Sequence, residues 1–126
     1  MHVLLANAVS VVHALVVAFM LTGALLALRR TGLVRVHAPL TAAVLAVNLA
    51  GLDCPLTQLE LHLRAAAGAT GSFSGGWLGH YVFSPVGLDV HAPAVQVGMY
   101  TVALGTNLVA YALLARRRTL SRRPVS

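Results

Sequence analysis

The sequence predicts an all-α membrane protein, in which three transmembrane helices carry an extracytoplasmic cap made of a short amphipathic helix and a half-inserted segment. Hydrophobic residues make up 58% of the 126 residues and charged residues only 10%, against roughly 25% charged in an ordinary soluble domain. Three uncharged runs approach or exceed the ~20 residues that a helix needs to cross the hydrocarbon core. No repeat or linker divides the chain, so 1–126 is expected to form a single membrane domain.

The first uncharged run is the longest and is followed directly by Arg29 and Arg30. A signal peptide has a basic start, a shorter apolar run and a cleavage site, whereas this run has no basic residue before it and an Arg pair after it, so a retained span is expected. Within it His13 shares one helix face with Asn7 and Ser10. That face is expected to pack against protein, because polar groups in hydrocarbon need partners. The three expected spans cover about 3–28, 36–52 and 94–115.

The segment 53–93 holds all three acidic residues and the only Cys and Trp of the chain. Pro55 is expected to begin a helix after Cys54, because the residue before a proline is pushed out of the α region. Thr57 and Glu60 have the spacing of a capping box, and Glu60 can pair with Arg64 at i,i+4. An apolar face then predicts a helix lying on the membrane surface with that face down; its members are Leu56, Leu59, Leu63 and Ala67.

The second half of this outer segment is rich in Gly and Ser, which predicts a loop over 68–76. The uncharged stretch 73–88 is short and is broken by Gly and Pro, so a half-inserted segment is expected there instead of a fourth span. Trp77 and Tyr81 within it are residue types that favour the membrane interface.

Charge predicts the orientation of the chain. The net charge is +6, and eight of the nine Arg lie in 29–35 and in the tail 116–126, which is expected to be frayed. Three spans put these two regions on one side, which the positive-inside rule makes cytoplasmic. The N-terminus and the cap 53–93 then face outward. A nucleic-acid partner is not expected, since the basic residues flank apolar spans and have no interleaved aromatics.

The polar residues form a specific combination. The run Cys54-Pro55-Leu56-Thr57 is followed by Glu60, preceded by His13 and His37, and completed by Ser74-Gly75-Gly76 and His80-Tyr81. In this pattern, over nearly its whole length, the chain resembles the uncharacterised bacterial membrane family catalogued as domain of unknown function 2784. The resemblance implies a multi-pass protein of the bacterial cytoplasmic membrane. It implies no known activity, cofactor or substrate.

The candidate functional or structural residues are His13, His37, Cys54, Thr57, Glu60, His80 and Tyr81. Imidazole and thiolate suit transition metals or haem iron, so His13, His80 and Cys54 are candidate ligands, although their spacing matches no known metal motif. Each also has a structural alternative. His13 is expected to hydrogen-bond the cap near Tyr81 or His80, Glu60 to cap a helix, and Cys54 to fill a helix junction or act as a thiol activated by a helix N-terminus. His37 is expected nearer the cytoplasmic face.

No phosphate loop, Ser-His-Asp set or paired carboxylates occur in the sequence, so no catalytic residue is assigned. The first hypothesis is a non-enzymatic inner-membrane protein that serves as an accessory or assembly partner. Three spans are few for a self-sufficient transporter, so a homo-oligomer or a larger membrane complex is expected. The alternative is a metal- or haem-binding membrane redox protein using His13, His80 and Cys54.

Orientation is tested by reporter fusions. A reporter fused after Ser126 is expected to be active in the cytoplasm, and one inserted beside Ala69 is expected to be active outside, because the Arg-rich regions stay on the cytoplasmic side. Cytoplasmic activity of the Ala69 insertion would overturn the orientation and the position of the cap.

Overall fold

The structure, a computed structural model, describes residues 1–69 and 76–121, and these residues form helices and connecting turns without a strand. Three helical stretches are long and apolar enough to cross a membrane, namely His2–Ala27, Thr31–Leu49 and Pro93–Ser121. The prediction of an all-α chain with three membrane-length helices is therefore confirmed. The elements are α1 (His2–Ala27), η1 (Thr31–Leu33), α2 (Val34–Leu49), α3 (Pro55–Ala66), α4 (Gly76–Leu78), η2 (Gly79–Phe83), η3 (Ser84–Val86) and α5 (Pro93–Ser121).

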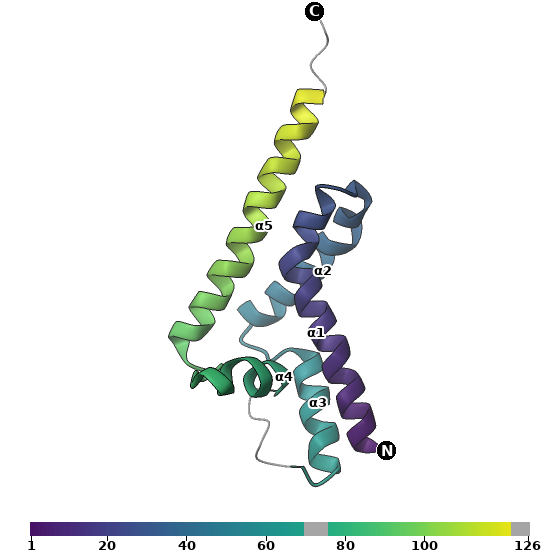
Figure 1. Ribbon diagram of the computed structural model, residues 1–126, viewed down its shortest axis with the longest axis vertical. Coiled ribbons are helices and arrows are strands. Elements are labelled where there is room, and N and C mark those ends of the chain that lie inside the picture. The colour runs from purple at the N-terminus through teal and green to yellow at the C-terminus, as the bar shows by residue number, and fades with distance from the viewer. Residues whose placement is uncertain (70–75, 122–126) are drawn as a thin grey trace, which may run out of the picture.

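Helix α1 is the axis against which the other elements pack. Figure 1 shows α3 beside its N-terminal half, α2 beside its C-terminal half, and α5 rising to the C-terminus on the other side. Side-chain contacts give the same order, because Arg64 of α3 bonds Ser10 and His37 of α2 bonds the carbonyl of Met20. After α1 the chain therefore turns back: α2 lies along the C-terminal half of α1, and α3 follows along its N-terminal half.

The interruption between α2 and α3 has a local cause. Gly51 takes a φ of +69°, a left-handed conformation that ends α2 at small steric cost. Three residues later Cys54 is the N-cap of α3 and Pro55 occupies the first helical position, where its missing N–H does no harm. The second membrane-length helix therefore ends at Leu49, earlier than the predicted boundary at 52.

The fully buried face of α1 is made of small and polar residues, while many of its leucines and valines point away. Leu4 is 75% exposed and Leu15 65% exposed. This arrangement suits a helix in lipid, where leucine gains nothing from the protein interior and small residues allow close helix approach. The buried residues of α1 are Ala6, Ser10, His13, Gly23, Ala24 and Ala27.

Helix α3 packs against the rest of the chain by its polar residues. Its buried residues are Glu60 and Arg64, whereas Leu59 is 47% exposed and Ala67 is exposed. Leu56 and Leu63, which share the apolar side with Leu59 and Ala67, are partly buried. That this side lies down on the membrane surface stays a prediction.

Two further differences concern the ends of elements. Helix α5 continues through Arg116 to Ser121, so the first part of the basic tail is helical instead of frayed. Residues 70–75 and 122–126, which include most of the predicted loop, Phe73 of the half-inserted segment and Arg122 and Arg123 of the tail, lie outside the described residues.

The close contact between α1 and α2 depends on Gly23. A Cβ added there would lie 3.0 Å from Cγ and Nε2 of His37 and closer still to its Cδ2. The variant Gly23→Ala is expected to lose about 1–3 kcal/mol of stability, the usual cost of overpacking, measured by thermal or denaturant unfolding in detergent. Gly32→Ala is the control, because no described atom lies within 4 Å of its added Cβ. Equal stability of the two variants would contradict this packing.

Candidate functional site

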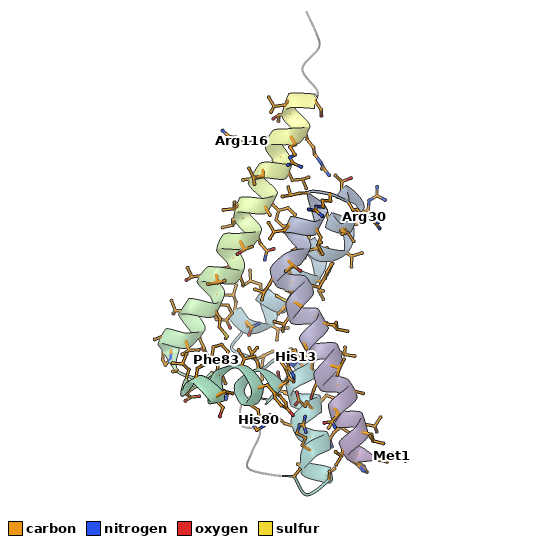
Figure 2. All side chains as sticks on the ribbon, viewed as in Figure 1. Met1, His13, Arg30, His80, Phe83 and Arg116 are labelled. Atoms are coloured by element: carbon orange, nitrogen blue, oxygen red, sulfur yellow. The ribbon has the colours of Figure 1, made fainter. Side chains whose placement is uncertain are left out.

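Polar side chains gather in three places. The ion-pair cluster consists of Ser10, Glu60, Arg64 and the backbone of Trp77, and the thiol pair consists of His13 and Cys54. The His37 cluster lies further along α1, near the basic end. Figure 2 shows Arg30 and Arg116 at the end of the molecule opposite Met1, with His13 at the height of the cap segment.

The ion-pair cluster joins α1, α3 and α4. Glu60 is 0% exposed and Arg64 6% exposed. Arg64 donates from Nε to Oε1 of Glu60 at 3.0 Å and from Nη2 to Oγ of Ser10 at 2.9 Å, and Ser10 in turn donates to the carbonyl of Ala6. The other carboxylate oxygen of Glu60 accepts the backbone N–H of Trp77 at 3.2 Å. Buried charges are stable only when paired and hydrogen-bonded in this way.

The predicted pairing of Glu60 with Arg64 is confirmed, but the predicted capping box is wrong. Thr57 cannot be the N-cap because Pro55 already occupies the first helical position and Cys54 is the N-cap. Thr57 instead lies against Gly76, where an added Cβ would be 3.0 Å from its Cγ2. Gly76 has a φ of +66°, so both its conformation and its lack of a side chain let the start of α4 sit against α3.

The thiol pair brings together residues from α1 and from the start of α3. Cys54 is the free cysteine of the chain and is partly buried, and His13 is 7% exposed. Hydrogen bonding by His13 lowers the pKa of Cys54 from 9.0 to about 7, burial opposes this, and the N–H groups of Leu56 and Thr57 assist it. The expected contact of His13 with Tyr81 or His80 stays a prediction.

The His37 cluster ties α1, α2 and α5 together. His37 is 0% exposed; its Nδ1 lies 2.6 Å from the hydroxyl of Tyr111 and its Nε2 lies 3.1 Å from the carbonyl of Met20. The same carbonyl accepts Nδ2 of Asn107 at 3.0 Å. The ring of Phe19 meets that of His37 edge to face at 5.4 Å. The sequence carried no signal for the role of Tyr111, because an aromatic residue near the end of a span suggests an interface anchor first.

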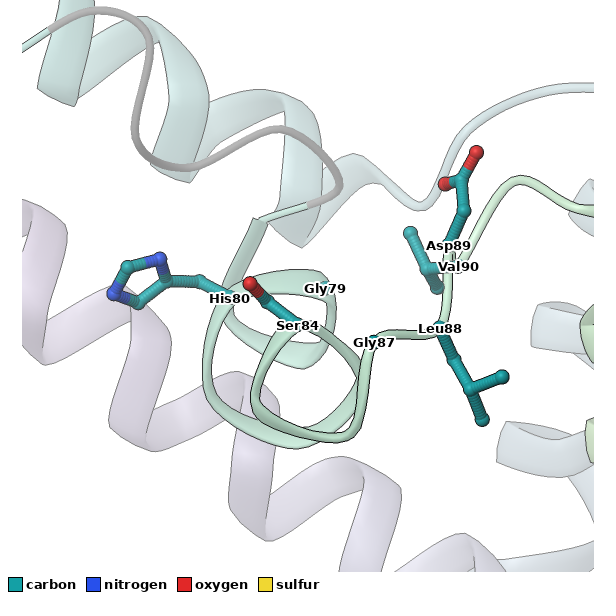
Figure 3. A pocket seen from close by; sticks show the side chains of 7 residues that line it. All are labelled: Gly79, His80, Ser84, Gly87, Leu88, Asp89 and Val90. Carbon is teal, nitrogen blue, oxygen red and sulfur yellow. The ribbon is translucent and has the colours of Figure 1, made fainter.

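The remaining candidates, His80 and Tyr81, lie on η2. Their rings meet edge to face at 4.7 Å, and Tyr81 also lies 6.3 Å from the ring of Trp77. Beside them is an open hollow of about 320 Å³. Figure 3 shows Ser84 and Asp89 at this hollow, with the imidazole of His80 directed away from Asp89. The hollow is lined by Gly79, His80, Ser84, Gly87, Leu88, Asp89 and Val90.

The structure brings two of the three proposed metal ligands together. His13 and Cys54 interact, but within 1–69 and 76–121 no three His, Cys, Asp or Glu side chains converge on a point that could hold a metal ion. His80 does not join the pair in this arrangement. Metal or haem ligation by His13, His80 and Cys54 therefore stays a prediction. The described residues do not bring these three side chains together around one point.

The fold and the three clusters define a class, the small all-helical proteins with three membrane-length helices whose buried polar groups bond across helices. Within this class the chain belongs to the family described as Protein of Unknown function (DUF2784), whose model matches residues 3–112. The resemblance seen in the sequence is thus confirmed. No curated protein and no solved structure matches the chain.

The ion-pair cluster makes a prediction about charge. Glu60→Gln is expected to cost about 3 kcal/mol or more, because it leaves the buried guanidinium of Arg64 without its counter-charge. The double variant Glu60→Leu with Arg64→Met removes both charges and is expected to cost less than either single change. Denaturant unfolding measures Glu60→Gln, the double variant and its two component single variants, with exposed Gln58→Ala as the control on the same helix. A silent Glu60→Gln would show that shape and hydrogen bonding suffice and that the charge is dispensable.

Proposed function

We propose that the protein is a multi-pass protein of the bacterial cytoplasmic membrane with a non-enzymatic role, an accessory or assembly partner that associates laterally with other membrane helices. The proposed orientation places the N-terminus and the cap outside and the C-terminus in the cytoplasm. It is supported by the gathering of Arg30 and Arg116 at one end and by Arg117, which donates to the carbonyl of Leu28 at that same end. Positive charge at a membrane boundary favours the cytoplasmic side.

The observation that carries the proposal is an unpaired face of α5. Gly98 and Gly105 lie seven residues apart on one side of this helix, and no described atom lies within 4 Å of a Cβ added to either. Val102 and Val109 on the same side are 63% and 60% exposed. Glycines in a membrane helix let a second backbone approach closely, and the described residues provide no such neighbour.

Helix α2 supports the same proposal. Its side away from α1 carries Ala42, Ala43 and Ala46, all of them exposed. Only His37 is buried among the residues of α2, and these three alanines lie on a side that the described residues leave uncovered. Alanines at a spacing of three and four residues form a flat surface that suits helix contact in a membrane.

The buried polar groups support a structural role over a transport path. Glu60, Arg64 and His37 each bond to a group on another helix of the same chain. A transporter needs polar groups that a substrate can reach near the middle of the membrane. Groups already engaged in holding helices together are poorly suited to this task.

The proposal predicts contact between copies of the chain in a bilayer. Two populations carrying donor and acceptor fluorophores, attached after Ser126 and reconstituted together in lipid vesicles, are expected to show energy transfer at a protein-to-lipid ratio too low for chance encounters. Gly105→Leu is expected to reduce this transfer several-fold, because its side chain keeps a second helix away from the glycine face.

Val97→Leu is the matched control, since Val97 is 64% exposed on α5 and lies about a quarter-turn away from Gly98 at 3.6 residues per turn. Its energy transfer is expected to equal that of the unaltered chain. Absence of transfer in the unaltered chain, or equal loss in both variants, would contradict association of copies through the glycine face.

A further inference from the structure

The basic end of the molecule is built from two chain segments that lie far apart in the sequence. The turn after α1 carries Arg29 and Arg30, and the last turns of α5 carry three consecutive arginines at 116–118. The two segments touch, because Arg117 donates from Nη1 to the carbonyl of Leu28 at 3.3 Å. The positive charge of both segments is therefore gathered at one place on the fold.

The three arginines of α5 point to different sides of the helix. Arg117 and Arg118 come three and four residues after Leu114, which is buried on the side of α5 that packs against α1. Arg116 comes seven residues after Val109, which is 60% exposed. Figure 2 shows Arg116 on the side of α5 away from α1. Two of the three arginines thus face the turn after α1, and the third faces away from it.

The basic end receives no counter-charge from the protein. The acidic residues of the sequence all lie in the cap segment; they are Asp53, Glu60 and Asp89. Figure 1 shows this part of the chain, which includes α3 and α4, away from the C-terminal end of α5. In the part of the chain that the structure describes, the only ion pair joins Arg64 to Glu60. A guanidinium without a carboxylate partner suits phosphate oxygens, because its planar fork of N–H donors binds them in pairs.

Exposed leucines adjoin these arginines on the side toward the middle of the molecule. Leu25 lies four residues before Arg29 and is 45% exposed, and Leu113 lies four residues before Arg117 and is 42% exposed. About one helical turn therefore separates each cation from an exposed apolar side chain. A phosphate group bound to the arginines and a hydrocarbon chain along the leucines belong together in one kind of molecule, a phospholipid at the edge of a bilayer.

We propose that Arg29, Arg117 and Arg118 form a binding site for the headgroup of an anionic phospholipid, in the leaflet at the basic end. The guanidinium groups bind the two unesterified oxygens of the phosphodiester, and the acyl chains run along Leu25 and Leu113. An ammonium headgroup brings its own positive charge toward the arginines, so a lipid whose headgroup has no amine is preferred. This inference rests on the proposed membrane location and not on the accessory role.

The site differs from a signal of orientation. The positive-inside rule counts arginines near a span wherever they point around the helix, whereas a binding site needs cations that converge. Arg116, Arg117 and Arg118 are equivalent by the first criterion. By the second, Arg117 and Arg118 belong to the site and Arg116 does not. Arg116 is therefore a matched control with the same charge, on the same helix, and likewise exposed.

The test is lipid binding by the full chain in a nonionic detergent. The chain is titrated with dioleoylphosphatidylglycerol or with dioleoylphosphatidylcholine, and bound lipid is counted by native mass spectrometry. The first phosphatidylglycerol is expected to bind roughly ten-fold more tightly than phosphatidylcholine. Arg117→Gln and Arg118→Gln are each expected to weaken phosphatidylglycerol binding roughly five-fold, the contribution of one cation beside an anionic headgroup. Arg116→Gln is expected to change it by less than about two-fold, because its side chain faces away from the site.

Two controls separate lipid binding from folding and from binding of free phosphate. Arg117→Gln also removes the bond to the carbonyl of Leu28, so Arg118→Gln is the second variant, which leaves that bond in place. Circular dichroism checks that each variant is folded. An excess of glycerol 3-phosphate is expected to leave the bound phosphatidylglycerol in place, because the soluble compound has no acyl chains to lie along Leu25 and Leu113.

Three results would overturn the inference. The first is equal affinity for the two lipids. The second is an equal loss of phosphatidylglycerol binding in Arg116→Gln and Arg118→Gln, which would show attraction by total charge without a site. The third is displacement of the lipid by glycerol 3-phosphate, which would show a site for soluble phosphate compounds. Lipid selectivity is measured in detergent and association through α5 in vesicles, so the inference and the proposed function fail separately.

Discussion

The buried pair of Glu60 and Arg64 is the constraint on which the cap end of the structure depends. Two opposite charges removed from water are stable only when both are fully hydrogen-bonded, and here the required partners come from three elements. Arg64 needs Ser10 on α1, and Glu60 needs the backbone of Trp77 on α4. A shift of α3 along α1 would break the bond between Arg64 and Ser10, and a displacement of α4 would break the bond between Glu60 and Trp77. The pair therefore specifies register as well as stability.

Hydrogen bonds of one buried side chain connect the helices at the other end of the molecule. His37 is buried between α1, α2 and α5, and its two ring nitrogens reach the Tyr111 hydroxyl and the Met20 carbonyl. Gly23 makes room for the ring, and Asn107 shares the Met20 carbonyl. Because lipid offers no hydrophobic drive to hold helices together, such bonds and close contacts determine how the helices pair.

Prediction from the sequence succeeds where a single physical quantity decides the outcome. The three long helices are predicted by length and the absence of charge, and the contact of Glu60 with Arg64 is predicted by helix spacing. Prediction fails for the start of α3, because the spacing of Thr57 and Glu60 predicts a capping box there and the N-cap is Cys54. The bond from Arg64 to Ser10 could not be predicted either, because it depends on α3 lying against α1. Tyr111 and Gly23 could not be found from the sequence, since their importance depends on where His37 points.

The surroundings of Cys54 depend on the same contact between α1 and α3 that the ion pair holds. His13 and Cys54 meet because the break after Gly51 and the start at Pro55 put Cys54 at the N-cap of α3, and because the ion pair on the same helix holds α3 to α1. One turn of α1 separates Ser10, which bonds Arg64, from His13, which lowers the pKa of Cys54. The ion pair on α3 and the start of the same helix therefore both depend on how α3 lies against α1. A change that loosens α3 on α1 acts on the ion pair and on the surroundings of Cys54 together.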